Sequence, residues 1–230
     1  MTDRFTLDRR AAIAGATLFT AAAVRSAAAQ GRPAIDAQTA LIVVDVQNDF
    51  CPGGRLAVPK GDEVVAVCNA IGRRFQNVVF TQDWHPEGHS SFASSHTGKK
   101  PFDVWPDHCT WDSAGAEFHD SLDIPHAQTI VRKGYRKEVD SYSGFLEADR
   151  KTTTGLGGYL KERGVSRAVV VGLATDFCVN WTAQDAAKAG LETYVVEEAC
   201  RAIDLGGSLD KAWADMAALG VKRIKVADLG

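Results

Sequence analysis

The sequence predicts an α/β protein: a three-layer αβα arrangement around a mostly parallel, doubly wound sheet of six strands. Two observations support this prediction. Short apolar runs rich in valine and isoleucine recur along the chain, as expected of strands buried on both faces. Segments with apolar residues at helical spacing separate these runs, and such alternation is typical of βαβ units.

The first half of the chain is predicted to hold three strands, at 40–44, 78–81 and 129–132, with a helix at 63–75. The stretch 83–123, before the third strand, is too long for a plain connection. Loops of this length often carry function, so this stretch is a first place to look for a site.

The second half is predicted to alternate in the same way. Its elements are, in order, helix 159–163, strand 167–173, helix 177–189, strand 193–196, helix 209–219 and strand 223–226. Because sites in parallel sheets form at the carboxyl ends of the strands, residues directly after each strand are candidates for chemistry.

The amino-terminal segment differs in composition from the rest. Arg9 and Arg10 precede an apolar run at 11–24, and small residues at A-x-A spacing follow at 26–29. This is the layout of an export signal, and the paired arginines resemble those of the twin-arginine route.

We therefore expect residues 1–29 to be a twin-arginine-like export signal, cleaved after Ala29, and residues 30–230 to form a single periplasmic domain. The alternatives are an uncleaved anchor or an alanine-rich helix of a cytoplasmic protein. Beyond this segment no apolar run reaches the ~18 residues of a membrane span, so no stable membrane anchoring is expected after cleavage.

The charge balance gives no reason to expect a nucleic-acid partner, because the net charge is -3 and there is no basic stripe. The five cysteines are an odd number, so disulfide pairing would leave at least one thiol free. The sequence leaves open whether Cys51 and Cys109 stay reduced, and whether the chain forms a homo-oligomer.

Cys178 is the first candidate for chemistry. It follows strand 167–173 and lies in the first turn of the next predicted helix. A helix N-terminus favours the thiolate over the thiol, and its free N–H groups can hold an oxyanion. The alternative is a small cysteine that only packs in the core.

Asp45 directly follows the first predicted strand, and Lys133 follows the third. The carboxylate suits a base for a nearby thiol, and the lysine suits a group that stabilises negative charge. Taken singly, Asp45 could be a turn residue and Lys133 a solvated one. Three such groups after three different strands favour a catalytic site.

A second group of candidates lies in the long loop. Asp83, His85 and His89 form a D-x-H-x3-H pattern, and His108 follows in WPDHC. Oxygen and imidazole ligands without thiolate suit one divalent metal ion: zinc, iron or manganese. Exposed loop histidines are the alternative.

Phe50 and Trp105 are aromatic residues beside these candidates in the sequence. They could clamp a flat ring. Packing of the loops explains them as well, and from the residues alone it is the better interpretation.

Several motifs then resemble, in order, those of nicotinamidases and pyrazinamidases, in the isochorismatase-like cysteine hydrolase superfamily. They are DVQNDFCPGG at 45–54, TQDWHP at 81–86, WPDHC at 105–109, KG at 133–134 and ATDFCV at 174–179. The resemblance extends over about residues 38–226 and implies the fold of that superfamily.

The resemblance implies a triad of Asp45, Lys133 and Cys178 that deaminates nicotinamide, and also pyrazinamide, through a thioester on the cysteine. It implies an oxyanion hole formed by the N–H groups of Ala174 and Cys178, with a cis peptide bond between Leu173 and Ala174.

The resemblance further implies that the metal ion is bound by Asp83, His85 and His108, with His89 a ligand that some relatives replace. The rings of Phe50 and Trp105 would then sandwich the substrate.

Three other functions stay open at this point. One is a related cysteine amidase that acts on another small amide or carbamoyl compound. Another is a periplasmic metal- or ligand-binding protein without catalysis, and the third is a metallohydrolase that uses metal-bound water. Such an export signal is unusual for nicotinamidases, which are usually cytoplasmic, so we expect a role in scavenging nicotinamide outside the inner membrane.

Overall fold

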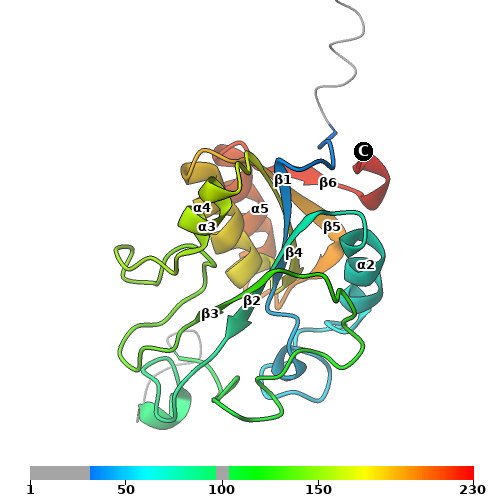
Figure 1. The fold of residues 1–230 in the computed structure, drawn as a ribbon. Helices are drawn as coiled ribbons and strands as arrows, with labels where there is room; N and C mark the ends of the chain where they lie inside the picture. The colour runs from blue at the N-terminus through cyan, green and yellow to red at the C-terminus, as the bar shows by residue number, and fades with distance from the viewer. Residues whose placement is uncertain (1–31, 97–103) are drawn as a thin grey trace, which may run out of the picture. The chain divides into compact units, whose positions relative to one another are not determined.

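Six parallel strands form the centre of the computed structural model, which describes residues 32–96 and 104–230 (Figure 1). The strands lie side by side in the order β3-β2-β1-β4-β5-β6. The predicted six-stranded α/β sheet is therefore confirmed, and every neighbouring pair is parallel. The predicted export signal falls outside the described residues.

The strands and helices of the sheet domain lie close to their predicted positions. The strands are β1 (Thr39–Val44), β2 (Asn77–Asp83), β3 (Thr129–Lys133), β4 (Arg167–Leu173), β5 (Glu192–Arg201) and β6 (Lys222–Ile224). The helices are α2 (Glu63–Gly72), α3 (Leu156–Glu162), α4 (Asn180–Lys188) and α5 (Ser208–Ala218).

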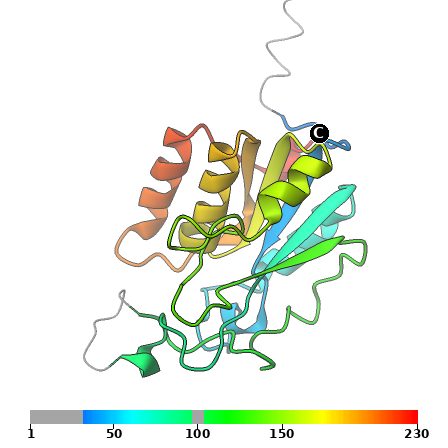
Figure 2. The ribbon, with the colours of Figure 1, turned by 60° about the vertical axis from the view of Figure 1, so that its left-hand side comes forward.

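The helices cover both faces of the sheet, which confirms the three-layer arrangement. Helix α2 packs on one face, while α3, α4 and α5 lie on the other (Figures 1 and 2). Each face has its own apolar core, because alternate residues of a strand point to opposite sides. In β1, for example, Leu41 and Val43 belong to the core under α2, and Ile42 belongs to the other.

The chain reverses its direction of travel across the sheet between β1 and β4. From β1 it continues outward to β2 and β3, and from β4 it continues to β5 and β6 on the other side. Gly172 permits the close approach here: it has a φ of +114°, and a Cβ on it would lie 2.1 Å from the carbonyl oxygen of Val44. Sites in such sheets form at this reversal, which places the residues after β1 and β4 together.

Several boundaries differ from the prediction by a few residues, and three of these differences have a clear structural reason. The predicted helix 177–189 begins instead as a π-helical turn, Thr175–Val179, that leads into α4. Strand β5 extends to Arg201 because it pairs with β4 again after an irregularity between Val170 and Gly172. The last strand ends at Ile224 because the backbone then turns into a short 3₁₀ helix.

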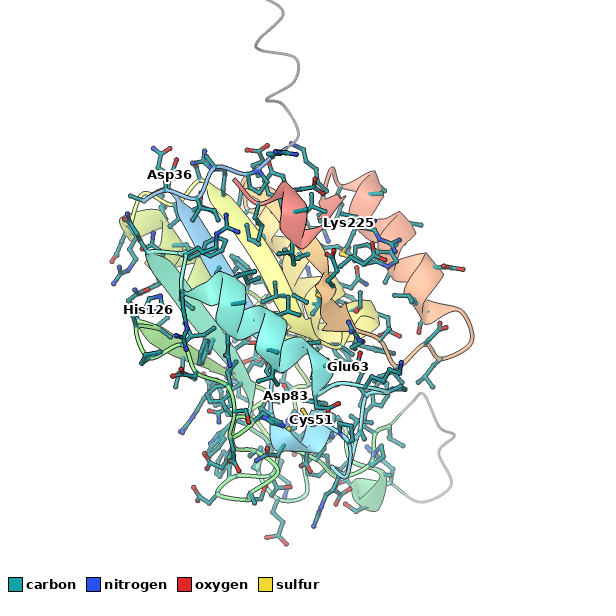
Figure 3. The ribbon with its side chains drawn as sticks, turned by 90° about the vertical axis from the view of Figure 1, so that its right-hand side faces the viewer. Asp36, Cys51, Glu63, Asp83, His126 and Lys225 are labelled. Atoms are coloured by element: carbon teal, nitrogen blue, oxygen red, sulfur yellow. The ribbon has the colours of Figure 1, made fainter. Side chains whose placement is uncertain are left out.

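The two ends of the sheet carry different features. Asp36 and Lys225 lie at one end, whereas Asp83 and Cys51 lie at the other (Figure 3). At the first of these ends the N–H of Gly230 donates a hydrogen bond to the carbonyl of Pro33 at 3.2 Å. None of the helices within 32–96 and 104–230 is long and apolar enough to cross a membrane.

Candidate active site

Lys133 is the hub of a buried cluster at the carboxyl end of the sheet. It is the last residue of β3, and its side chain has no exposed surface. Its ammonium Nζ lies 2.8 Å from Oδ2 of Asp45 and 3.4 Å from Sγ of Cys178, and it donates to the carbonyl of Ser141 at 3.2 Å. The structure thus brings together the three residues that follow three different strands.

The surrounding groups keep Lys133 charged. Burial alone lowers the pKa of this lysine, but Asp45, Asp83 and Cys178 raise it, and the pKa ends well above its ordinary value. The ammonium therefore persists across the neutral range. Its burial is tolerated because the carboxylates compensate the charge.

Asp45 is placed to accept a proton. Its Oδ1 accepts a hydrogen bond from Oγ1 of Thr81 at 2.7 Å, while its Oδ2 faces Lys133 without a hydrogen bond of regular geometry. Burial raises the pKa of Asp45; Lys133 opposes this, Asp83 adds to it, and the pKa ends above its ordinary value. A carboxylate with a raised pKa is a stronger base for a neighbouring thiol.

Cys178 lies in the π-helical turn after β4, and the structure corrects the protonation state expected from that position. Burial raises the pKa of the thiol; Lys133 lowers it, Asp45 and Asp83 raise it further, and the pKa ends well above its ordinary value. The resting group is therefore a thiol rather than the thiolate that a helix N-terminus alone would favour. A thiol beside a basic carboxylate suits proton transfer during attack.

Lys133 also contacts Asp83, which joins the catalytic cluster to the candidate metal ligands. Sequence reasoning treated these as two separate groups. The register of the sheet connects them, because Asp83 at the end of β2 pairs directly with Lys133 at the end of β3. The sequence indicates that both residues follow strands. Their contact could be predicted only with the knowledge that these two strands are neighbours in the sheet.

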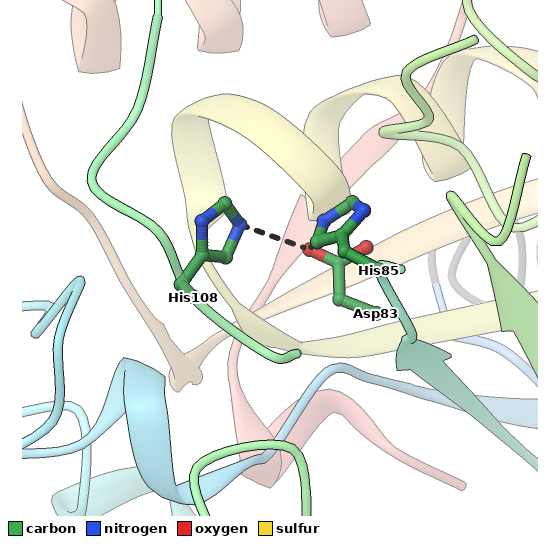
Figure 4. Close-up of side chains that lie close together, drawn as sticks. All are labelled: Asp83, His85 and His108. Atoms are coloured by element: carbon green, nitrogen blue, oxygen red, sulfur yellow. Dashed lines mark ion pairs between the residues drawn. The ribbon is translucent and has the colours of Figure 1, made fainter. Parts of the chain in front are cut away.

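Asp83, His85 and His108 form the candidate metal site (Figure 4). All three side chains are buried, and one ligand atom from each lies within 4.8 Å of the others. Nε2 of His85 lies 3.6 Å from Oδ2 of Asp83, and Nε2 of His108 lies 3.7 Å from the same oxygen. These separations are too long for hydrogen bonds.

The donor set fits a divalent transition metal. Ligands at 2.0–2.2 Å from a tetrahedral ion are about 3.4 Å apart, close to the separations found here. Nδ1 of His85 donates to the carbonyl of Gly134 at 2.9 Å, and Nδ1 of His108 donates to that of Pro106 at 2.7 Å. Each backbone carbonyl thereby orients its ring and leaves Nε2 available as a ligand.

His89 is not one of these three residues but belongs to a second possible ligand set with His85 and Asp140, and its place in the predicted ligand set stays a prediction. Its ring lies 4.3 Å from that of His85, but both of its nitrogens are occupied. Nδ1 is 2.7 Å from Oγ of Ser91, and Nε2 is 3.2 Å from the carbonyl of Val139. Ligation would require Nε2 to leave that carbonyl.

A pocket opens onto Cys178. Three of the residues named from the sequence as ring-binding or oxyanion groups border it: Phe50, Trp105 and Ala174. The peptide bond between Leu173 and Ala174 is cis, as the resemblance implied. Thus the predicted substrate groups and the nucleophile share one cavity.

Other pocket residues were missed by sequence reasoning. Tyr142 accepts a hydrogen bond from Nε1 of Trp105 at 2.9 Å and so supports that ring, and Phe177 meets the same ring edge-on at 4.9 Å. The full set that was missed is Leu56, Asp140, Ser141, Tyr142, Phe177 and Ile203. Among these residues, only Phe177 could have been predicted from the sequence, because it directly precedes the cysteine in the motif ATDFCV.

Gly134 tests the candidate metal site. It has a φ of +68°, and a Cβ on it would lie 2.4 Å from Cε1 of His85. Gly134→Ala should therefore displace His85 and weaken metal binding about 10- to 100-fold, as loss of an outer-shell contact does. Metal retained during dialysis against graded chelator measures this.

Gly164→Ala is the matched control, because Gly164 has a φ of +70° and nothing within 4 Å of an added Cβ. Equal metal loss in both variants would attribute the effect to backbone strain and contradict the role assigned to His85.

Comparisons with known proteins find relatives of this chain. A family model described as "Isochorismatase domain" matches residues 39–228. The nicotinamidase of Acinetobacter baylyi is 56% identical over 195 residues, covering 80% of this chain and 91% of that protein.

Solved structures share the fold, among them the following two. A nicotinamidase and pyrazinamidase of Acinetobacter baumanii has a TM-score of 0.83 at 53% identity, covering 84% of this chain and 98% of the other. The pyrazinamidase of Pyrococcus horikoshii in complex with zinc has a TM-score of 0.72 at 38% identity, covering 82% and 99% of the two chains.

Proposed function

This chain belongs to the isochorismatase family, and from that premise we propose that it is an amidohydrolase that converts nicotinamide to nicotinate and ammonia. Pyrazinamide, a close analogue, would be a second substrate. The observation that carries the proposal is the meeting of Asp45 and Lys133 with Cys178, which borders the pocket, beside the group formed by Asp83, His85 and His108.

In the first half of the reaction, Cys178 Sγ attacks the carboxamide carbon while its proton passes to Asp45. The N–H groups of Ala174 and Cys178 would stabilise the oxyanion. The C–N bond then breaks as Asp45 returns the proton to the nitrogen, which leaves as ammonia. A thioester on Cys178 remains.

In the second half, water attacks the thioester carbon and gives a proton to Asp45. The C–S bond breaks, the sulfur recovers the proton from Asp45, and the nicotinic acid that forms loses its own proton to solvent and becomes nicotinate. Lys133 holds the carboxylate in place and compensates negative charge through both halves.

We propose that Asp83, His85 and His108 hold one divalent ion: zinc, iron or manganese. When bound, such an ion would supply a Lewis acid for the nitrogen of the substrate ring. The zinc in the Pyrococcus horikoshii protein supports this assignment. Elemental analysis of protein purified without added metal would identify the ion.

Ammonia release from nicotinamide tests the activity. The metal-loaded enzyme should turn over at about 1–10³ s⁻¹, the common range for enzymes. Carbamoyl amides at equal concentration are the comparison, and they should react far more slowly. Absence of ammonia from nicotinamide, with release from a carbamoyl amide, would instead assign a related cysteine amidase.

The other two functions give different results in the same assay. A binding protein without catalysis would release no ammonia from any amide while still retaining metal. A metallohydrolase would keep its activity after alkylation of Cys178, whereas the proposed mechanism loses it.

We further propose that residues 1–29 direct the chain to the periplasm, where it would scavenge nicotinamide. The paired Arg9 and Arg10 before an apolar run support this. Fractionation of cells and sequencing of the mature N-terminus would test it. The expected first residue is Gln30, and a cytoplasmic chain that keeps Met1 would overturn the proposal.

A further inference from the structure

The connection between β5 and α5 forms one wall of the active-site pocket. Its residue Ile203 borders the pocket together with Phe177 and Cys178. The same connection contains Gly206 and Gly207, with φ values of +60° and +85° and no heavy atom within 4 Å of an added Cβ on either. The wall therefore depends on contacts from outside the connection to stay in place.

Asp176 supplies three of those contacts, and residues of α5 supply others. Asp176 is buried, with 5% of its surface exposed. Its Oδ1 accepts a hydrogen bond from the N–H of Ile203 at 3.1 Å, and its Oδ2 accepts one from the N–H of Asp204 at 2.8 Å. Oγ of Ser208, at the start of α5, donates to the same oxygen at 2.5 Å. One carboxylate thus binds both ends of the connection.

Asp176 lies in the same π-helical turn as Cys178, two residues before it. The turn holds the nucleophile, and the carboxylate ties Ile203 to that turn. The distance between the sulfur and the opposing apolar wall is therefore set by Asp176. Hydrogen bonds to an ionised group are stronger than those between neutral groups, which suits a tie that must hold a short, glycine-containing connection.

We propose that Asp176 is a positioning residue that fixes the Ile203 wall against Cys178 and thereby sets the affinity for flat aromatic amides. The inference rests on the proposed amidohydrolase function. It assigns Asp176 no contact with substrate and no proton transfer.

Asp176→Asn is the first variant to measure. The amide has nearly the same shape but replaces one acceptor oxygen with an NH₂ donor. That donor would face the N–H and O–H groups that donate to Asp176, so hydrogen bonds are lost. The KM for nicotinamide should rise about tenfold, as expected for lost hydrogen bonds to a charged group, with a smaller change in kcat. The alkylation rate of Cys178 and the pH profile of kcat should stay within about twofold of the wild type.

Ile203→Ala completes a double-mutant cycle. If Asp176 acts through Ile203, the two single changes each raise KM, and Ile203→Ala has little further effect when Asp176 is already Asn. Additive effects on KM, or a changed pH profile, would overturn the inference. Asp210→Asn, an exposed acid in the first turn of α5, is the matched control and should leave KM unchanged.

Ser208→Ala serves if Asp176→Asn does not fold. It removes one of the three hydrogen bonds to Asp176, together with the one that Ser208 Oγ accepts from the N–H of Leu205 at 2.8 Å. It should raise KM by a smaller factor, again without additivity with Ile203→Ala. Failure of the proposed function would be recognised by a different result, because the wild-type enzyme itself would then release no ammonia. An active wild type with an unchanged KM in the variants overturns only the inference.

Discussion

Cys178→Ala is expected to abolish ammonia release from nicotinamide, with a loss of at least about 10⁴-fold in kcat/KM. The side chain that would form the thioester is absent, and no other described thiol borders the pocket. Metal content should be unchanged, because the proposed ligands are Asp83, His85 and His108 and do not include Sγ of Cys178. Single-turnover assays at high enzyme concentration measure the loss.

Cys68→Ala is the matched control. This thiol is also fully buried, but it lies on the buried face of α2, away from the pocket. Its loss should lower stability while turnover remains. Turnover that survives in Cys178→Ala would overturn the nucleophile assignment and favour a metallohydrolase.

Lys133→Met should have the largest effect on stability. The change removes the ammonium that lies between the carboxylates of Asp45 and Asp83. Removing one partner of a buried ion pair costs about 3–5 kcal/mol of unfolding free energy. The Tm of the metal-free protein should fall by on the order of 10 °C, and activity should be lost.

Two further variants separate charge from size. Lys137→Met, at an exposed lysine of the following loop, should leave the Tm nearly unchanged. Adding Asp45→Asn to Lys133→Met should restore part of the lost stability, because one buried negative charge is removed. A double variant less stable than Lys133→Met would show that the ammonium does not act by compensating these carboxylates.

The fold could be predicted largely from local pattern. Strands such as β1 and β4 are continuous apolar runs, and this reflects their burial on both faces. The order of the strands could not be read in the same way. It depends on which edges pair after folding, and no single segment encodes that choice.

In the site, too, local features could be predicted from the sequence and tertiary ones could not. Asp45, Lys133 and Cys178 were found because each follows a strand, and the sheet alone brings them together. Tyr142 was missed because it lies in an irregular loop, where no periodicity signals direction. The state of the Cys178 thiol was misjudged because a helix terminus is a local feature, whereas burial and neighbouring carboxylates are tertiary ones.

The hydrogen bond between Gly230 and Pro33 has a consequence for topology. Because these residues meet away from the site, a short linker could join them into a circular backbone. Reopening that circle at the exposed Gly190, between α4 and β5, would give a permuted chain with every strand intact. Cys178 would then lie near the new carboxyl end, and turnover would require β5 to dock beside β4 from the opposite order of synthesis.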